Sequence, residues 1–244
     1  MKGYNIKKYK NRFAECRCAG FGPNYTPFIT VQEAKSYGTA AMIPDPFEGR
    51  YIHCLSRAES DFYYTLRWND DVAHIREQFL LDPDIISKVF ADMGFGKMSN
   101  YFTTDFLVDF KDGSQTAFSI KGSKKEFDPD NPKYRGSKSQ YAKLINRQAA
   151  EAEYWERQGV SFAIVTSDML NMTFITNVKM LMSHYDTLLI RNTEQKLMWL
   201  LAHKFIQTDM TEKVINPRQL VEASKIDIDD FYDHVQEAIN NERD

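Results

Sequence analysis

The sequence is short of cysteine and of long hydrophobic runs. It has three cysteines, Cys16, Cys18 and Cys54, which are too few for a disulfide framework, so we expect a reducing cytoplasmic setting. It contains no run of roughly 18 apolar residues, which argues against a membrane-spanning helix and a membrane partner. Its first ten residues lack the apolar core of a secretory signal peptide.

The charged residues are distributed unevenly along the chain. The 244 residues suffice for one large or two small domains, and 43% hydrophobic and 27% charged residues are typical of a globular protein. The net charge is −3, yet six Lys and Arg stand against one acid in residues 1–20 and nine against four in residues 111–147. Residues 209–244 have four basic residues and ten acidic ones. The basic stretches fit a polyanionic partner such as DNA, or are simply solvated faces.

A predicted β-hairpin occupies the middle of the chain. Apolar residues alternate over 104–110 and 116–120, and Lys111-Asp112-Gly113 forms a turn between them. A three-residue turn pairs Asp105 with Ser119 and places on one face Phe106, Val108, Phe118 and Ile120. The opposite face then carries Asp105, Asp109, Ser119 and Lys121. A two-residue turn at Asp112-Gly113 would shift this register by one residue.

The surrounding pattern predicts an α/β fold, in which a mixed sheet is flanked by helices. We expect helices after the N-cap residue Ser56 and over residues 139–158, with strands over residues 72–81 and 160–166. The long helix has residues at helical spacing that we expect to face inward: Tyr141, Leu144, Ile145, Ala149, Ala152 and Trp155. Scattered Gly and Pro in residues 1–50 predict an irregular arm without a regular element.

The sheet closes near residue 167, so we divide the chain into an N-terminal arm (1–50), an α/β domain (51–167) and a small helical domain (168–244). In the last of these, helical patterns cover residues 176–183, 193–205, 217–223 and 229–239. Three short helices with a tight turn before the last resemble a winged-helix or helix-turn-helix unit. The last helix carries acids that would repel phosphates, so it fits a protein partner better than a DNA groove.

Three residues suit the hydrolysis of a phosphodiester bond. This chemistry requires a divalent metal held by carboxylates, an activated water and a cation for developing charge. Glu59 and Asp105 are the candidate metal ligands, and Lys121 is the candidate group that positions or polarises the water. Mg²⁺, for which Mn²⁺ can substitute, prefers such oxygen ligands. Glu59 has an alternative role as the capping-box partner of Ser56.

Further residues of the hairpin region complete this candidate site. The carbonyl of Ile120 is a candidate third metal ligand, and Ser119 and Gln78 are candidate supporting residues around the ligands. Residues 122–138 form a polar segment that we expect to be a loop following DNA phosphates, through Lys124, Lys125, Lys133, Arg135 and Lys138. A zinc site of Cys16, Cys18, His53 and Cys54 is less favoured than ordinary thiols, because the spacing differs from paired-ligand patterns.

The order of these motifs resembles a nuclease family. Asp105, thirteen further residues and then Ser119-Ile120-Lys121 resemble the PD-(D/E)xK nuclease superfamily, with Ser119 in place of the usual second acid. The wider series resembles the TnsA endonuclease family, whose members are subunits of heteromeric cut-and-paste transposases. That series comprises Ser56–Glu59, Val72–Gln78, Thr104–Phe106, Ser119–Lys121, Glu153–Trp155 and Phe162–Thr166.

This resemblance implies a bacterial protein with a restriction-endonuclease-like domain followed by a winged-helix-like domain. It implies Mg²⁺-dependent cleavage of the 5′, non-transferred strands at transposon ends, with Glu59, Asp105 and Lys121 as catalytic residues. It also implies a DDE transposase partner, TnsB, and an ATPase regulator, TnsC. Two alternatives stay open: a catalytically silent adaptor between these partners, which Ser119 and the acidic last helix favour, and a stand-alone restriction or repair nuclease.

Overall fold

The chain forms two compact units, Met1–Leu170 and Asn171–Asp244. The computed structural model describes residues 11–34, 39–96, 100–134, 137–187 and 189–241. Arg135, one of the predicted DNA contacts, therefore lies outside the described residues. No helix in these ranges has the length and apolar character needed to cross a membrane.

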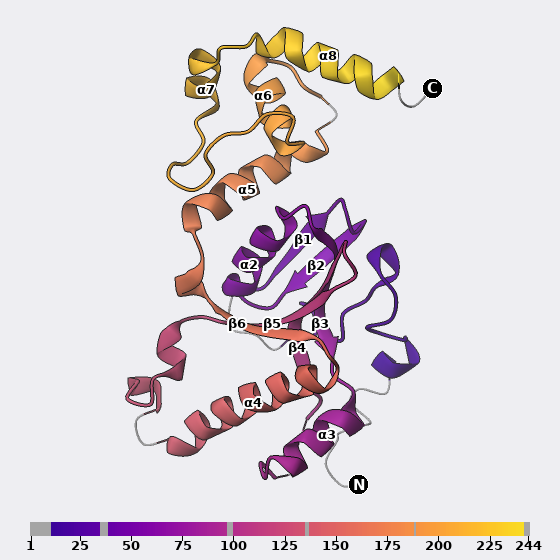
Figure 1. Cartoon of the computed structure of the whole chain (residues 1–244), viewed down its shortest axis with the longest axis vertical. Coiled ribbons are helices and arrows are strands. Elements are labelled where there is room, and N and C mark those ends of the chain that lie inside the picture. Colours follow the sequence, from indigo (N-terminus) through magenta and orange to yellow (C-terminus); the bar gives the residue numbers. More distant parts are fainter. Residues whose placement is uncertain (1–10, 35–38, 97–99, 135–136, 188, 242–244) are drawn as a thin grey trace. The chain divides into compact units, whose positions relative to one another are not determined.

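The first unit is built on a mixed four-stranded sheet (Figure 1). Its strands are β3 (Val72–Leu80), β4 (Thr103–Phe110), β5 (Gln115–Lys121) and β6 (Ser161–Thr166), in the order β3-β4-β5-β6. The first two pairings are antiparallel, and β5 pairs with β6 in parallel through a crossover that contains the helix α4 (Lys138–Arg157). The predicted mixed sheet flanked by helices is confirmed.

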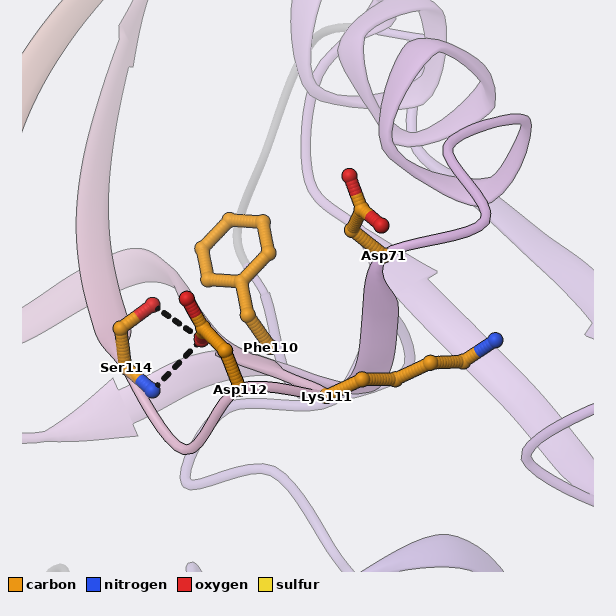
Figure 2. Close-up of a pocket in the computed structure, with 5 residues that line it drawn as sticks. All are labelled: Asp71, Phe110, Lys111, Asp112 and Ser114. Carbon is orange, nitrogen blue, oxygen red and sulfur yellow. Dashed lines mark hydrogen bonds between the residues drawn. The ribbon is translucent and has the colours of Figure 1, made fainter.

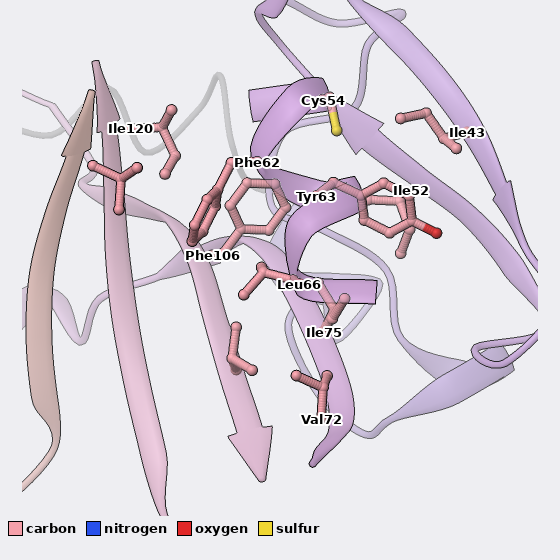
Figure 3. Close-up of a cluster of buried hydrophobic side chains, with 12 residues drawn as sticks. Ile43, Ile52, Cys54, Phe62, Tyr63, Leu66, Val72, Ile75, Phe106 and Ile120 are labelled. Carbon is pink, nitrogen blue, oxygen red and sulfur yellow. The ribbon is translucent and has the colours of Figure 1, made fainter. Parts of the chain in front are cut away.

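Each face of this sheet is covered by a separate apolar cluster. On one face, α2 (Arg57–Arg67) packs Phe62, Tyr63 and Leu66 against the strands (Figure 3). On the other, α3 (Pro83–Asp92) and α4 contribute Ile86, Val89, Ala150, Tyr154 and Trp155. Because adjacent strand residues point to opposite faces, Phe106 and Val108 enter the first cluster and Leu107 enters the second. The sheet is thus a central layer with α2 on one face and α3 and α4 on the other.

The hairpin of β4 and β5 has the register expected from a three-residue turn. Phe106 pairs with Phe118 and Asp109 with Gln115, and the amide of Phe110 donates to the carbonyl of Ser114 over 2.9 Å. Gly113 lies in the turn at a φ of 85°, where a side chain would be strained. Phe106, Val108, Phe118 and Ile120 all pack on the α2 side, as predicted.

The expectation that residues 1–50 hold no regular element is wrong. Strand β1 (Ala41–Asp45) pairs with β2 (Arg50–Cys54) in an antiparallel two-stranded sheet, and Ile43, Ile52 and Cys54 join the cluster beneath α2. Pro44 obscured this strand, since proline cannot donate a ladder hydrogen bond and is confined to strand edges. A short 3-10 helix, η1 (Gly22–Asn24), precedes it.

The inward face of α4 also differs from the prediction. Ala149 and Ala152 are only half-buried, whereas the buried residues of the helix are Gln148, Ala150, Glu151, Tyr154 and Trp155. The buried face is displaced from the predicted one, so that Gln148 and Glu151 face inward in place of Ala149 and Ala152. Residues 122–137 before this helix contain two 3-10 turns, η2 (Lys124–Phe127) and η3 (Pro132–Tyr134).

The second unit is helical in its described part. It contains α5 (Met172–Tyr185), α6 (Thr193–Ala202), α7 (Pro217–Ala223) and α8 (Ile228–Asn241), and a 3-10 turn, η4 (Ser167–Met169), precedes it. The side chains of Asn171, Asn192 and Asn216 cap α5, α6 and α7 by accepting a backbone N–H, which sets where each helix begins. No strand occurs among the described residues of this unit.

Candidate active site

Asp105 and Lys121 meet where β4 and β5 run side by side. Asp105 Oδ2 accepts a 2.6 Å hydrogen bond from the amide of Ile120 and lies 3.7 Å from Lys121 Nζ. Extending the hairpin register by one residue places Asp105 opposite Ser119, as predicted. The two side chains keep 20% and 16% of their surface exposed, so the pair is open to solvent.

Lys121 is held by oxygen atoms of its own strand. Its Nζ donates to Ser119 Oγ over 2.7 Å and to the Ile120 carbonyl over 3.0 Å. Ser119 is therefore an acceptor for the lysine. These contacts orient the ammonium group beside the Asp105 carboxylate.

Glu59 makes the capping-box contacts that the sequence allows and also lies near the charge of Asp105. The Ser56 hydroxyl accepts from the Glu59 amide over 3.2 Å and donates to Glu59 Oε1 over 2.9 Å, while Oε2 accepts from the Leu55 amide over 2.8 Å. Burial and, after it, the nearby charge of Asp105 together raise the pKa of Glu59 to about 7. Glu59 thus caps α2 and lies within the electrostatic reach of Asp105.

Gln78 links Glu59 to the central strands. Its side-chain amide donates to Glu59 Oε2 over 3.3 Å, and its amide oxygen accepts from the Thr103 hydroxyl over 3.2 Å. Gln78 has a φ of 48°, which is uncommon for a residue other than glycine and within a strand requires support from its surroundings.

The structure adds a residue that sequence reasoning missed. Glu151 on α4 is 1% exposed, and its Oε1 has no hydrogen-bond partner among the described residues. Burial raises the pKa of Glu151 to about 7, and the charge of Asp105 contributes in the same direction. Gln148, three residues earlier on the same helix face, is also buried, and neither of its amide atoms has such a partner. The usable signal was an acid at an inward helical position.

The donor atoms of this region suit a hard divalent cation. Asp105, Glu59 and the Ile120 carbonyl offer the oxygen ligands that Mg²⁺ prefers. The mutual repulsion of Asp105 with Glu59 and Glu151 is of the kind that a bound cation relieves, and the unpaired Oε1 of Glu151 adds a buried acceptor. No three His, Cys, Asp or Glu side chains in the described ranges form a ready-made metal cluster, so carbonyl oxygens and water would have to complete the shell.

The predicted basic contacts lie on the segment that follows Lys121. Lys124 and Lys125 are exposed on η2, Lys133 is exposed at η3, and Lys138 opens α4 instead of ending a loop. The Lys124 amide donates to Asp168 Oδ2 over 2.6 Å, which ties the segment to the end of β6. All four ammonium-bearing side chains therefore follow the site closely in the chain.

A surface cavity of about 330 Å³ lies at the hairpin turn and is lined by Asp71, Phe110, Lys111, Asp112 and Ser114 (Figure 2). Phe110 is five residues along β4 from Asp105, or roughly 17 Å at strand spacing. This cavity is therefore separate from the carboxylate–lysine site.

The cysteines do not form a zinc site. Cys16 is exposed, whereas Cys54 is buried in the cluster beneath α2. The Sγ atom of Cys18 lies 3.7 Å from the Gln78 carbonyl and 3.4 Å from the Leu80 amide, so this thiol bonds to the backbone of β3. The favoured reading of ordinary thiols agrees with these positions.

Comparison with known proteins gives two matches. Residues 69–167 match the family described as TnsA-like endonuclease N terminal. The transposon Tn7 transposition protein TnsA of Escherichia coli is 30% identical over 177 residues, which make up 70% of this chain and 61% of that relative. The matched range contains β3, the hairpin, α4 and β6, and with them Asp105, Lys121 and Glu151. Residues 69–167 are thus of the TnsA-like endonuclease type, and the chain spans about three fifths of the Tn7 relative's length.

Proposed function

We propose that this protein is a metal-dependent DNA endonuclease subunit of a cut-and-paste transposase. It cleaves the 5′, non-transferred strands at transposon ends. The observation that carries the proposal is the meeting of Asp105 and Lys121, 3.7 Å apart and open to solvent, with the buried Glu59 in the electrostatic reach of Asp105. The family match of residues 69–167 supports the reaction class, and the relative's description as a transposition protein supports the setting.

Each residue has a distinct role in this proposal. Asp105, Glu59 and the Ile120 carbonyl would hold Mg²⁺, or Mn²⁺ in its place, and the side chain of Gln78 orients Glu59. When bound, the metal supplies Lewis-acid chemistry to the phosphate and its attacking water. Lys121 orients that water and offsets negative charge that develops on the phosphate, and Ser119 holds the lysine in place.

The test compares two aspartates of the same strand. Asp105→Asn should reduce nicking at transposon ends by at least ~10²-fold, because it removes a metal ligand at the reacting centre. Asp109→Asn is the matched control, since Asp109 pairs with Arg76 and Gln115 away from the site. Strand-specific end mapping should place the lost cuts on the 5′ strands. Equal cleavage by wild type and Asp105→Asn would reject the proposed site.

The partners follow from the same proposal. A DDE transposase of the TnsB type would cut and join the 3′ ends, and an ATPase regulator of the TnsC type would contact the helical unit, which we propose to be winged-helix-like. Nicking should therefore need the partner proteins, whereas a stand-alone restriction or repair nuclease would cleave without them.

A second candidate is a catalytically silent adaptor. Ser119 favours it, because a hydroxyl that accepts from Lys121 replaces an acidic metal ligand. The adaptor requires that wild type never nicks DNA and binds no Mn²⁺ at millimolar concentration. Metal-dependent nicking that chelation abolishes and Mn²⁺ restores would exclude it.

A further inference from the structure

The strand that carries Gln78 changes face at that residue. Ile75 packs in the cluster under α2, whereas Phe79, four residues later, packs against the cluster under α4. A regular strand would place these two side chains on the same face. Gln78, with a φ of 48°, is the left-handed residue between them, so the face change occurs beside Glu59.

An N-terminal segment, residues 18–28, holds the backbone at this point. The amide of Phe28 donates to the Gln78 carbonyl over 3.2 Å, and the Tyr25 hydroxyl donates to the Glu77 carbonyl over 2.8 Å. The Leu80 amide donates to Cys18 Sγ over 3.4 Å. Three groups of one segment thus bond to the backbone on both sides of Gln78 and to Gln78 itself.

The contacts of Tyr25 and Phe28 are buried, and the contact of Cys18 is partly buried. Tyr25 is 3% exposed and Phe28 is 1% exposed. On the same stretch of strand, Arg50 stacks over the Tyr25 ring at 4.8 Å and forms two 2.8 Å hydrogen bonds with the fully buried Glu77. Tyr25 and Phe28 are therefore packed onto β3 as core residues are.

We propose that residues 18–28 act as a positioning clamp for the active site. The clamp holds the backbone of Gln78 in its left-handed conformation. The side-chain amide of Gln78 then holds Glu59 in a metal-binding orientation. Tyr25 and Cys18 are positioning residues in this scheme, because they act through Gln78 and do not touch the Asp105–Lys121 pair. The inference rests on the proposed nuclease function but can be measured without catalysis.

The first test is the affinity of the full-length chain for Mn²⁺. It is measured by the electron paramagnetic resonance signal of the Mn²⁺ that stays free. Tyr25→Phe removes one clamp hydroxyl and should weaken Mn²⁺ binding about tenfold, since changing the groups that orient a metal ligand typically costs about 10- to 100-fold in metal affinity. Gln78→Ala should weaken binding at least as much. In the double variant, Tyr25→Phe should add nothing further, because its effect passes through Gln78.

Tyr154→Phe is the matched control. The Tyr154 hydroxyl accepts from the Asp82 amide over 3.0 Å, so this change also removes a tyrosine–backbone hydrogen bond but leaves Gln78 untouched. It should lower thermal stability comparably and leave Mn²⁺ binding unchanged. Cys18→Ser, which keeps a donor and acceptor, should bind Mn²⁺ better than Cys18→Ala.

Nicking by the assembled complex separates the clamp from the function itself. If wild type nicks DNA while Tyr25→Phe matches it in nicking and Mn²⁺ binding, the clamp is overturned and the nuclease stands. If wild type binds Mn²⁺ but never nicks DNA, the proposed nuclease function is rejected. The Mn²⁺ affinities of the single and double variants then still decide whether the clamp exists. Additive losses in the double variant, or no Mn²⁺ binding by wild type, would also overturn the clamp.

Discussion

At the scale of single residues, Glu151 is a buried acid whose Oε1 lacks a partner among the described residues. Glu151→Gln keeps its shape and removes a desolvated charge, so the free energy of unfolding at pH 8 should stay equal or rise. Nicking should fall by at least ~10-fold if the carboxylate serves the site, by analogy with other acid–base groups. Glu153→Gln, at an ion pair with Arg157 on the helix surface, is the control for both measurements.

The candidate site residues differ in how far sequence alone could reveal them. Asp105 and Lys121 were predictable because alternation and a three-residue turn determine the hairpin register. Glu151 was missed because polar residues are expected on the outer face of a helix, although its spacing of four residues from the inward Trp155 was a signal. The left-handed backbone of Gln78 was equally hidden, since the neighbours that support it come from residues 18–28.

At the scale of elements, the ion pair of Arg17 and Glu33 fastens the N-terminal segment. Burial of Glu33 opposes its ionisation, but hydrogen bonds from Arg17 and Thr30 prevail and lower its pKa from 4.5 to about 2. The stabilisation is therefore complete above pH 4.5 and disappears as the pH falls towards 2.

Chemical denaturation across this pH range measures that contribution. Glu33→Gln should lower the free energy of unfolding at pH 7 by up to about 1 kcal/mol, the usual limit for a partly exposed pair. The difference from wild type should shrink between pH 4.5 and the acid limit of folding. Glu156→Gln, an exposed glutamate on α4, should show no such pH dependence. A constant difference at all pH values would mean that packing, not charge, is responsible.

At the scale of the whole molecule, the charge distribution matters more than the net charge of −3. Neutralising Lys124, Lys125 and Lys133 together should weaken DNA binding and reduce the slope of log affinity against log salt by roughly 0.9 for each lost phosphate contact. Lys88→Ala, an exposed lysine of α3, serves as the control. An unchanged slope would remove these three lysines from the DNA interface.

The predicted fold agrees with the structure where the periodicity of apolar residues is strong. The order of helices and strands from α2 to β6 follows the sequence pattern, and so do the four helices of the second unit. The strand at residues 41–45 escaped prediction, because its short apolar set is interrupted by Pro44 and becomes regular only through pairing with β2.

The candidate site residues come from separate elements, which has a consequence for biosynthesis. Glu59, Asp105, Lys121 and Glu151 come from α2, β4, β5 and α4, so contacts between distant parts of the chain must form before the site exists. Such long-range contacts form slowly compared with local helices. A chain still emerging from the ribosome therefore has no complete site until α4 has been released. Its N-terminal segment must likewise wait for β3 before it can hold Gln78.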